Sequence, residues 1–92
     1  MTEAWDVQFA PSALRGLDRL PPRIAPAIIE FVTQTLPRNP EQLSKSLRGE
    51  LECLCSARRG DYRVLFRLHP DRRILLVVRV AHRASVYRAG ER

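Results

Sequence analysis

The stretch RRGDYRVLFR, residues 58–67, decides the fold. Its Gly-Asp pair is typical of a tight turn. From residue 62 to residue 68 every second side chain is apolar, and Arg63 and Arg67 lie between these apolar positions. The alternation predicts a strand with an apolar face that packs on a core and an arginine face that can meet an anion.

Helical and strand periodicities predict further elements on both sides of this strand. Ser12 is expected to cap the first helix, and Pro37 is expected to end the second. The residues between Pro37 and Lys45 are expected to form a loop with at most one helical turn. The expected elements are a strand near residues 4–10, helices at 11–20 and 22–37, strands at 51–58, 62–68 and 74–81, and a short last strand or tail at 86–88.

The order of these elements predicts an α+β fold. An N-terminal strand leads into a helical hairpin, and a three-to-four-stranded antiparallel meander follows. The helices should pack on one sheet face, because their apolar stripes need a partner. Residues 1–92 are therefore expected to form a single domain.

The arginines are expected to gather on the other sheet face. We expect the helices to cover the face that carries Val64, Phe66, Leu76 and Val78. Five arginines on adjacent strands would repel one another unless an anion binds there. The members of this expected arginine face are Arg58, Arg63, Arg67, Arg79 and Arg83.

Composition limits the class of partner and the compartment. Five basic and five acidic residues balance in residues 1–47, whereas eleven arginines and five acidic residues in 48–92 carry the whole net charge of +6. Such an uneven distribution indicates an anionic partner. The start of the chain lacks the pattern of a signal peptide, and no apolar run is long enough for a membrane helix. We therefore expect a cytoplasmic protein, with Cys53 and Cys55 as reduced, buried thiols.

Three motifs resemble those of the RelE/ParE superfamily of bacterial toxins. They are Leu47-Arg48-Gly49, then Gly60-Asp61-Tyr62-Arg63, and finally His82-Arg83 followed by Tyr87-Arg88. With the helical segment that ends at Leu20-Pro21, the resemblance covers nearly the whole chain and is fairly specific in order and spacing. It implies a RelE-like fold and the toxin of a type II toxin–antitoxin system.

The resemblance also implies an activity and a site. RelE-like toxins are metal-independent endoribonucleases that cut mRNA in the ribosomal A site by attack of the RNA's own 2′-OH, and no cofactor is expected. Guanidinium groups suit the extra negative charge of the transition state. The implied catalytic residues are Arg63, Arg83 and Tyr87, with His82 as a candidate base. The expected RNA-binding residues are Arg58, Arg59, Arg67, Arg79, Arg48 and Lys45.

One departure from the family pattern concerns the general base. RelE enzymes carry two lysines on a central strand, and the matching positions here are Leu54 and Ser56. Lys45 is the only lysine of the chain, and we expect it to lie too far away to replace them. The base is then expected to be His82, Glu52 or Tyr87.

Two other functions stay open at this point. The chain can be a ParE-like inhibitor of DNA gyrase, or a catalytically weak toxin that acts with its antitoxin as a transcriptional corepressor. The expected partners are a RelB-like antitoxin, the 30S A site and mRNA, and no membrane. The toxin–antitoxin complex is expected to be hetero-oligomeric and to bind operator DNA through the antitoxin.

Overall fold

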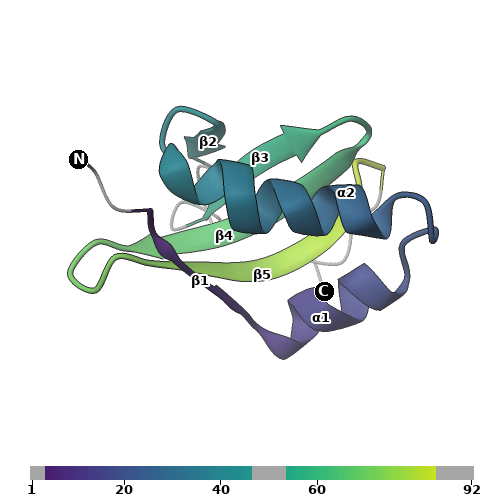
Figure 1. Cartoon of the computed structure of the whole chain (residues 1–92), viewed down its shortest axis with the longest axis horizontal. Coiled ribbons are helices and arrows are strands. Elements are labelled where there is room, and N and C mark those ends of the chain that lie inside the picture. Colours follow the sequence, from purple (N-terminus) through teal and green to yellow (C-terminus); the bar gives the residue numbers. More distant parts are fainter. Residues whose placement is uncertain (1–3, 47–53, 85–92) are drawn as a thin grey trace.

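A five-stranded sheet carries two helices on one of its faces (Figure 1). The computed structural model describes residues 4–46 and 54–84. The strand order is β1-β5-β4-β3-β2, and the α+β prediction is confirmed. The elements are β1 (Asp6–Phe9), α1 (Pro11–Asp18), α2 (Ala25–Glu30), β2 (Ser44–Ser46), β3 (Cys55–Arg59), β4 (Tyr62–His69) and β5 (Ile74–His82).

The last four strands pair antiparallel, as the short turns between β3, β4 and β5 require. The N-terminal strand β1 instead pairs parallel with β5. The edge strand β2 lies where the sequence predicted a loop, and that part of the prediction is wrong. Its residues, Ser44–Ser46, are polar and lack alternation, so only their pairing with β3 makes them a strand.

The second helical segment begins later than expected. Regular α2 starts at Ala25, and the backbone continues through a π-helical turn at Phe31–Thr35 and a 3-10 turn at Leu36–Arg38. Pro37 lies within this last turn, so it does not end the helical segment as predicted. Pro26 is accommodated in the first turn, where its missing N–H is not needed.

The phase of β5 differs from the prediction. Leu75, Val77 and Val80 are buried in the core beneath the helices, whereas the sequence placed Leu76 and Val78 there. The register explains the difference, because Phe66 pairs with Val77 and the preceding Leu65 pairs with Arg79. Val78 is thus an extra residue in β5, and such a bulge shifts the alternation by one.

Where β1 ends, the first residues of helix α1 continue the hydrogen bonding to β5. The Ala10 N–H donates to the Val77 carbonyl at 2.8 Å, and the Ser12 hydroxyl donates to the carbonyl of the bulge residue Val78 at 2.5 Å. Ser12 therefore does not cap α1 as predicted. A Cβ at Gly16 would overlap the Val80 carbonyl oxygen, so this close approach of α1 to β5 requires glycine.

The core lies between the helices and one face of the sheet. Val64, Phe66 and Ala57 contribute from the sheet, and Ile28 and Val32 from α2 and the turn after it. A second, small cluster forms on the opposite sheet face, which we call the far face. It contains Leu54, Leu65, Val78 and Ala81.

Two sequence predictions concern cysteines and membranes. Cys55 is a free thiol packed against the main core, as expected, although it is half-buried and not fully buried. Cys53 lies outside the described residues. Within residues 4–46 and 54–84, no helix has the length and apolar character to cross a membrane.

Candidate functional site

The β3–β4 hairpin places two arginines directly opposite each other. Gly60 supplies the positive φ of 62° that the turn needs. The neighbouring pair Ala57 and Val64 is buried beneath the helices, so alternation directs the next pair, Arg58 and Arg63, to the far face. Like charges that face each other across two strands destabilise a sheet. This pairing therefore indicates a site that binds an anion.

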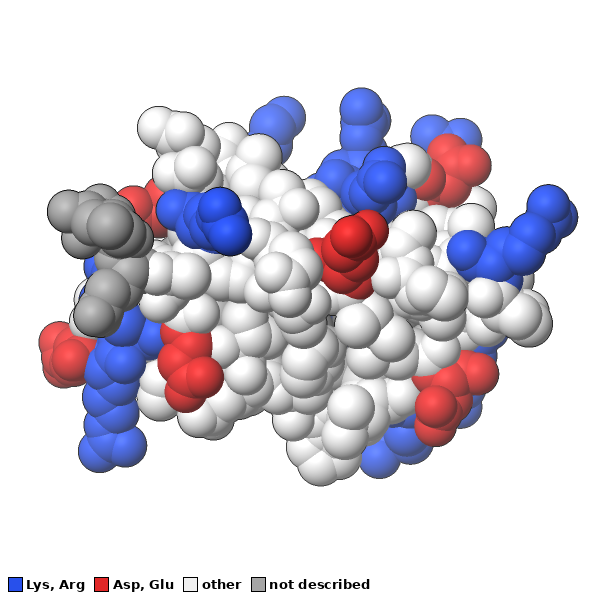
Figure 2. Space-filling view, viewed as in Figure 1, with Lys and Arg blue, Asp and Glu red and all other residues white. Residues whose placement is uncertain are grey.

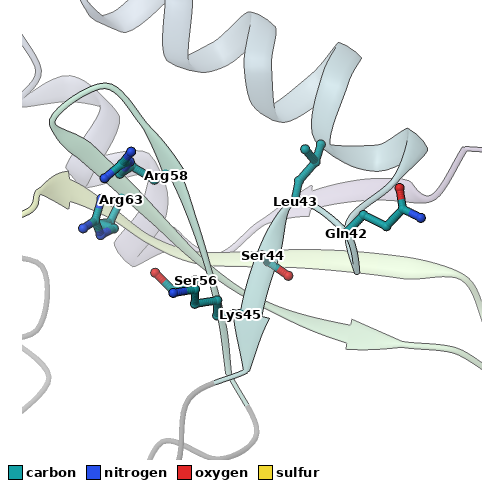
Figure 3. A pocket seen from close by; sticks show the side chains of 7 residues that line it. All are labelled: Gln42, Leu43, Ser44, Lys45, Ser56, Arg58 and Arg63. Atoms are coloured by element: carbon teal, nitrogen blue, oxygen red, sulfur yellow. The ribbon is translucent and has the colours of Figure 1, made fainter.

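The arginine pair lines an open hollow of about 580 Å³, which we call the basic hollow (Figure 3). Strands β2, β3 and β4 and the loop before β2 supply its walls. Figure 3 shows Arg58 and Arg63 together near the hairpin turn, with Lys45 and Ser56 farther along the sheet. The residues that line the hollow are Gln42, Leu43, Ser44, Lys45, Ser56, Arg58 and Arg63.

Arg63 carries a buried donor that lacks a partner. Its Nη1 atom is shielded from solvent and has no hydrogen-bond acceptor among the residues that the structure describes. A buried donor without an acceptor is costly, and more so when it is charged. An anion in the basic hollow would supply the missing acceptor.

The position of Lys45 corrects a sequence prediction. The β2–β3 register pairs Lys45 with Ser56, one of the two positions where a lysine was missing. Lys45 thus lines the same hollow as Arg63, although the sequence placed it too far away. Only the unexpected strand β2 creates this proximity. The other position, Leu54, is buried in the small apolar cluster.

The other predicted site residues that the structure describes do not line this hollow. Arg67 shares the far face, but it pairs with Leu76 farther along β4. The exposed Arg83 lies beyond β5, where its backbone N–H donates to the Asp61 carbonyl at 2.8 Å. Arg59 pairs with Tyr62 on the helix side of the sheet. Arg48 and Tyr87 lie outside the described residues.

A second basic groove, which we call the His82 groove, lies between α1 and β5. Arg15 and Arg19 line it from the α1 segment, and Arg79 lines it from β5. The rings of Tyr62 and His82 meet edge to face there, with centroids 5.3 Å apart. The structure thus brings Arg79 and His82 to a groove that Arg63 does not line. The sequence did not assign Arg15 and Arg19, although their spacing of four on a helix is a usable signal.

His82 has a defined hydrogen bond in this groove. The Ala84 N–H donates to His82 Nδ1 at 3.1 Å. His82 pairs with Tyr62, whose ring packs against the main core, so it faces the helix side as strand alternation predicted. The Nδ1 lone pair is occupied by this backbone donor.

On the helix side, basic side chains lie mostly around the rim of the surface, and acidic side chains are interspersed with them (Figure 2). The described residues that line the basic hollow, by contrast, include three cations and no carboxylate. Concentrated positive charge in a concave site attracts anions more strongly than charge spread over a surface.

Comparison with known proteins identifies the relatives of this chain. A family model described as "ParE toxin of type II toxin-antitoxin system, parDE" matches residues 7–87. The chain is 44% identical over 84 residues to Toxin RelG of Mycobacterium tuberculosis, covering 91% of this chain and 97% of that protein. It is 43% identical over 84 residues to Toxin RelE of the same organism, covering 91% and 87%.

Solved structures agree with this relationship. The toxin–antitoxin complex RelBE2 from Mycobacterium tuberculosis superimposes with a TM-score of 0.84 at 41% identity, covering 87% of this chain and 99% of the matched chain. A mutant of the Escherichia coli toxin RelE in the free state gives a TM-score of 0.74 at 16% identity, covering 97% and 94%. The second similarity concerns the fold alone.

Proposed function

Because this chain belongs to the RelE/ParE superfamily of type II toxin–antitoxin toxins, we propose that it is a ribosome-dependent mRNA endoribonuclease. It cuts mRNA in the ribosomal A site and thereby stops translation. The RNA's 2′-OH is the nucleophile, and the reaction needs no metal. The products carry a 2′,3′-cyclic phosphate and a 5′-OH.

The observation that supports this chemistry most strongly is the Arg58–Arg63 pair, in which a buried Arg63 donor has no acceptor among the described residues. Attack of the 2′-OH produces a phosphorane with an additional negative charge. Guanidinium groups that are fixed and partly desolvated stabilise such charge best. Arg63 is therefore the proposed catalytic arginine, and Arg58 supports it across the hairpin.

Other residues have proposed roles outside this pair. Arg83 and Tyr87 are proposed to contact the scissile phosphate and a neighbouring base. His82 lines another groove and has its Nδ1 bonded, so we place it outside the proposed catalytic set. The proposed contacts to flanking phosphates come from Arg48, Arg59, Arg67 and Arg79.

The proposed inhibitor is a RelB-like antitoxin. The related RelBE2 toxin of Mycobacterium tuberculosis was solved as a toxin–antitoxin complex, and its chain is 41% identical to this one. We propose that this chain acts in the cytoplasm and forms a similar hetero-oligomeric complex. That complex would bind operator DNA through the antitoxin.

Induction of the chain in cells, followed by primer extension on a translated message, tests the nuclease proposal. Wild type should produce cuts in phase with the codons, and Arg63→Ala should produce none. Arg72→Ala is the matched control, because it removes one positive charge from the exposed β4–β5 turn. Growth arrest with intact mRNA would contradict the proposal.

Gyrase inhibition is the second candidate. The apolar environment of Leu54, at a position where RelE enzymes carry a lysine, favours it, because it removes one cation from the nuclease site. Under this alternative, induction should cause cleavage of chromosomal DNA without cuts in mRNA. If induction caused no growth arrest, the result would favour the third function, a weak toxin that acts with its antitoxin as a transcriptional corepressor.

A further inference from the structure

Cleavage of RNA by its own 2′-OH needs a proton for the departing 5′-oxygen. Guanidinium groups remain protonated in proteins and transfer protons poorly. Arg58 and Arg63 are therefore unsuitable as the acid that protonates the 5′-oxygen. The other lining groups, apart from Lys45, are hydroxyl, amide and apolar side chains. Among the described residues that line the basic hollow, Lys45 is thus the one whose proton can be given up and regained readily.

The strand register places Lys45 on the opposite wall from Arg63. Lys45 belongs to β2 and Arg63 to β4, and β3 lies between them. The register places Lys45 level with Leu65, two residues along β4 from Arg63. At the usual strand spacing and rise, the Cα atoms of Lys45 and Arg63 are about 12 Å apart. Their long side chains can therefore reach one phosphate from opposite sides. Figure 3 shows the Lys45 amine beside Ser56, on the side of the hollow toward Arg63.

We propose that the Lys45 ammonium is the general acid of the reaction, an inference that rests on the proposed nuclease function. The 2′-oxygen forms its bond to phosphorus and loses its proton to water, while the bond from phosphorus to the 5′-oxygen breaks. Lys45 Nζ gives its proton to that 5′-oxygen and later regains one from solvent. Arg58 and Arg63 hold the charge of the non-bridging oxygens. The proposed acid, Lys45, thus lies on β2, directly opposite Ser56 on the neighbouring strand β3.

The test uses a short synthetic mRNA, bound to ribosomes, in which sulfur replaces the 5′-bridging oxygen at the cleavage site. A thiolate leaves without protonation, so a protein that has lost its general acid should still cleave this substrate. Lys45→Arg keeps the charge and removes the usable proton. It should cleave the ordinary oxygen substrate about 100-fold more slowly than wild type. On the sulfur substrate its rate should fall less than about threefold.

Arg63→Ala is the contrasting variant, because charge stabilisation is needed for both leaving groups. It should lose activity on both substrates. A double variant, Lys45→Ser with Ser56→Lys, moves the ammonium across the β2–β3 pair and should regain much of the rate that Lys45→Ser alone loses. Circular dichroism checks that the variants are folded.

Equal losses of Lys45→Arg on the two substrates would overturn the acid assignment, and so would full activity of Lys45→Arg on the oxygen substrate. Both results leave the nuclease proposal standing, because wild type still cleaves. If wild type left the oxygen substrate intact on ribosomes, the nuclease proposal itself would be overturned.

Discussion

Tyr62 and Arg63 are neighbours in β4, yet they belong to two different basic sites. Arg63 lines the basic hollow on the far face, and Tyr62 lines the His82 groove on the helix side. In the hollow, three paired strands direct Lys45, Arg58 and Arg63 to one place. In the groove, arginines from separate elements surround an aromatic pair.

The two sites differ in whether their polar groups already have hydrogen-bond partners within the protein. Within the described part of the chain, a cationic donor of Arg63 is buried in the hollow without an acceptor, an arrangement that favours strong stabilisation of an incoming anion. In the groove, the exposed His82 already accepts a backbone hydrogen bond. Aromatic rings beside arginines suit binding of nucleic acid without chemistry. Under the proposed nuclease function, we therefore expect catalysis in the basic hollow and at most binding in the His82 groove.

Removal of the Arg63 guanidinium should have the largest effect. Arg63→Ala should slow cleavage on ribosomes about 100- to 1,000-fold, the usual cost of losing a donor that stabilises transition-state charge. Its thermal stability should not fall, because the variant removes a buried unsatisfied donor and the repulsion from Arg58. Single-turnover rates and melting curves check both parts. A large loss of stability would contradict this view of the hollow.

Gly16→Ala should mainly affect the side of the molecule that holds the His82 groove. The added methyl group would overlap the Val80 carbonyl oxygen, so α1 must move away from β5. Overpacking of this kind costs about 1–3 kcal/mol of unfolding free energy. Urea unfolding measures the cost, with Ala27→Gly as a control for helix propensity. An unchanged midpoint would show that α1 does not pack as closely as described.

Arg58→Ala should have an intermediate effect, because Arg58 is exposed and supports Arg63 from the neighbouring strand. We expect weaker binding to a single-stranded RNA that contains the target codon. The slope of log affinity against log salt should become shallower by about 0.7, the contribution of one phosphate contact. Fluorescence anisotropy at several salt concentrations gives the slope. An unchanged slope would mean that Arg58 contacts no phosphate.

His82→Ala should have the smallest effect on cleavage. A general base contributes about 100-fold or more, and we expect a loss of less than about tenfold because His82 lies outside the hollow. His82→Asn, which retains a polar side chain, is the conservative control. A loss of two orders of magnitude in both variants would restore His82 as the base and move the catalytic centre toward the groove.

The sequence was sufficient for the hairpin and for placing Arg58 and Arg63 on one face of adjacent strands. Alternation from Tyr62 onward and the Gly-Asp turn predict β4 and the turn before it. The phase of β5 was not predictable, because it depends on the bulge at Val78, whose carbonyl is bonded by the distant Ser12. Periodicity in one segment carries no information about such a tertiary contact.

The same limit explains why the sequence did not place Lys45 beside Ser56 in the basic hollow. The segment Ser44–Ser46 has no apolar alternation, so nothing local indicates a strand. Its pairing with β3 alone brings Lys45 opposite Ser56 and completes the basic hollow. When the residues of a site come from different strands, their proximity can be recognised only once the pairing of those strands is known.

The most direct test compares the two sites in one assay. Single-turnover cleavage of mRNA on ribosomes should be measured for Arg63→Ala and for the double variant Arg15→Ala/Arg19→Ala. We expect a loss of at least about 100-fold for the hollow variant and of less than about tenfold for the groove variant. The reverse order would contradict the assignment of catalysis to the basic hollow.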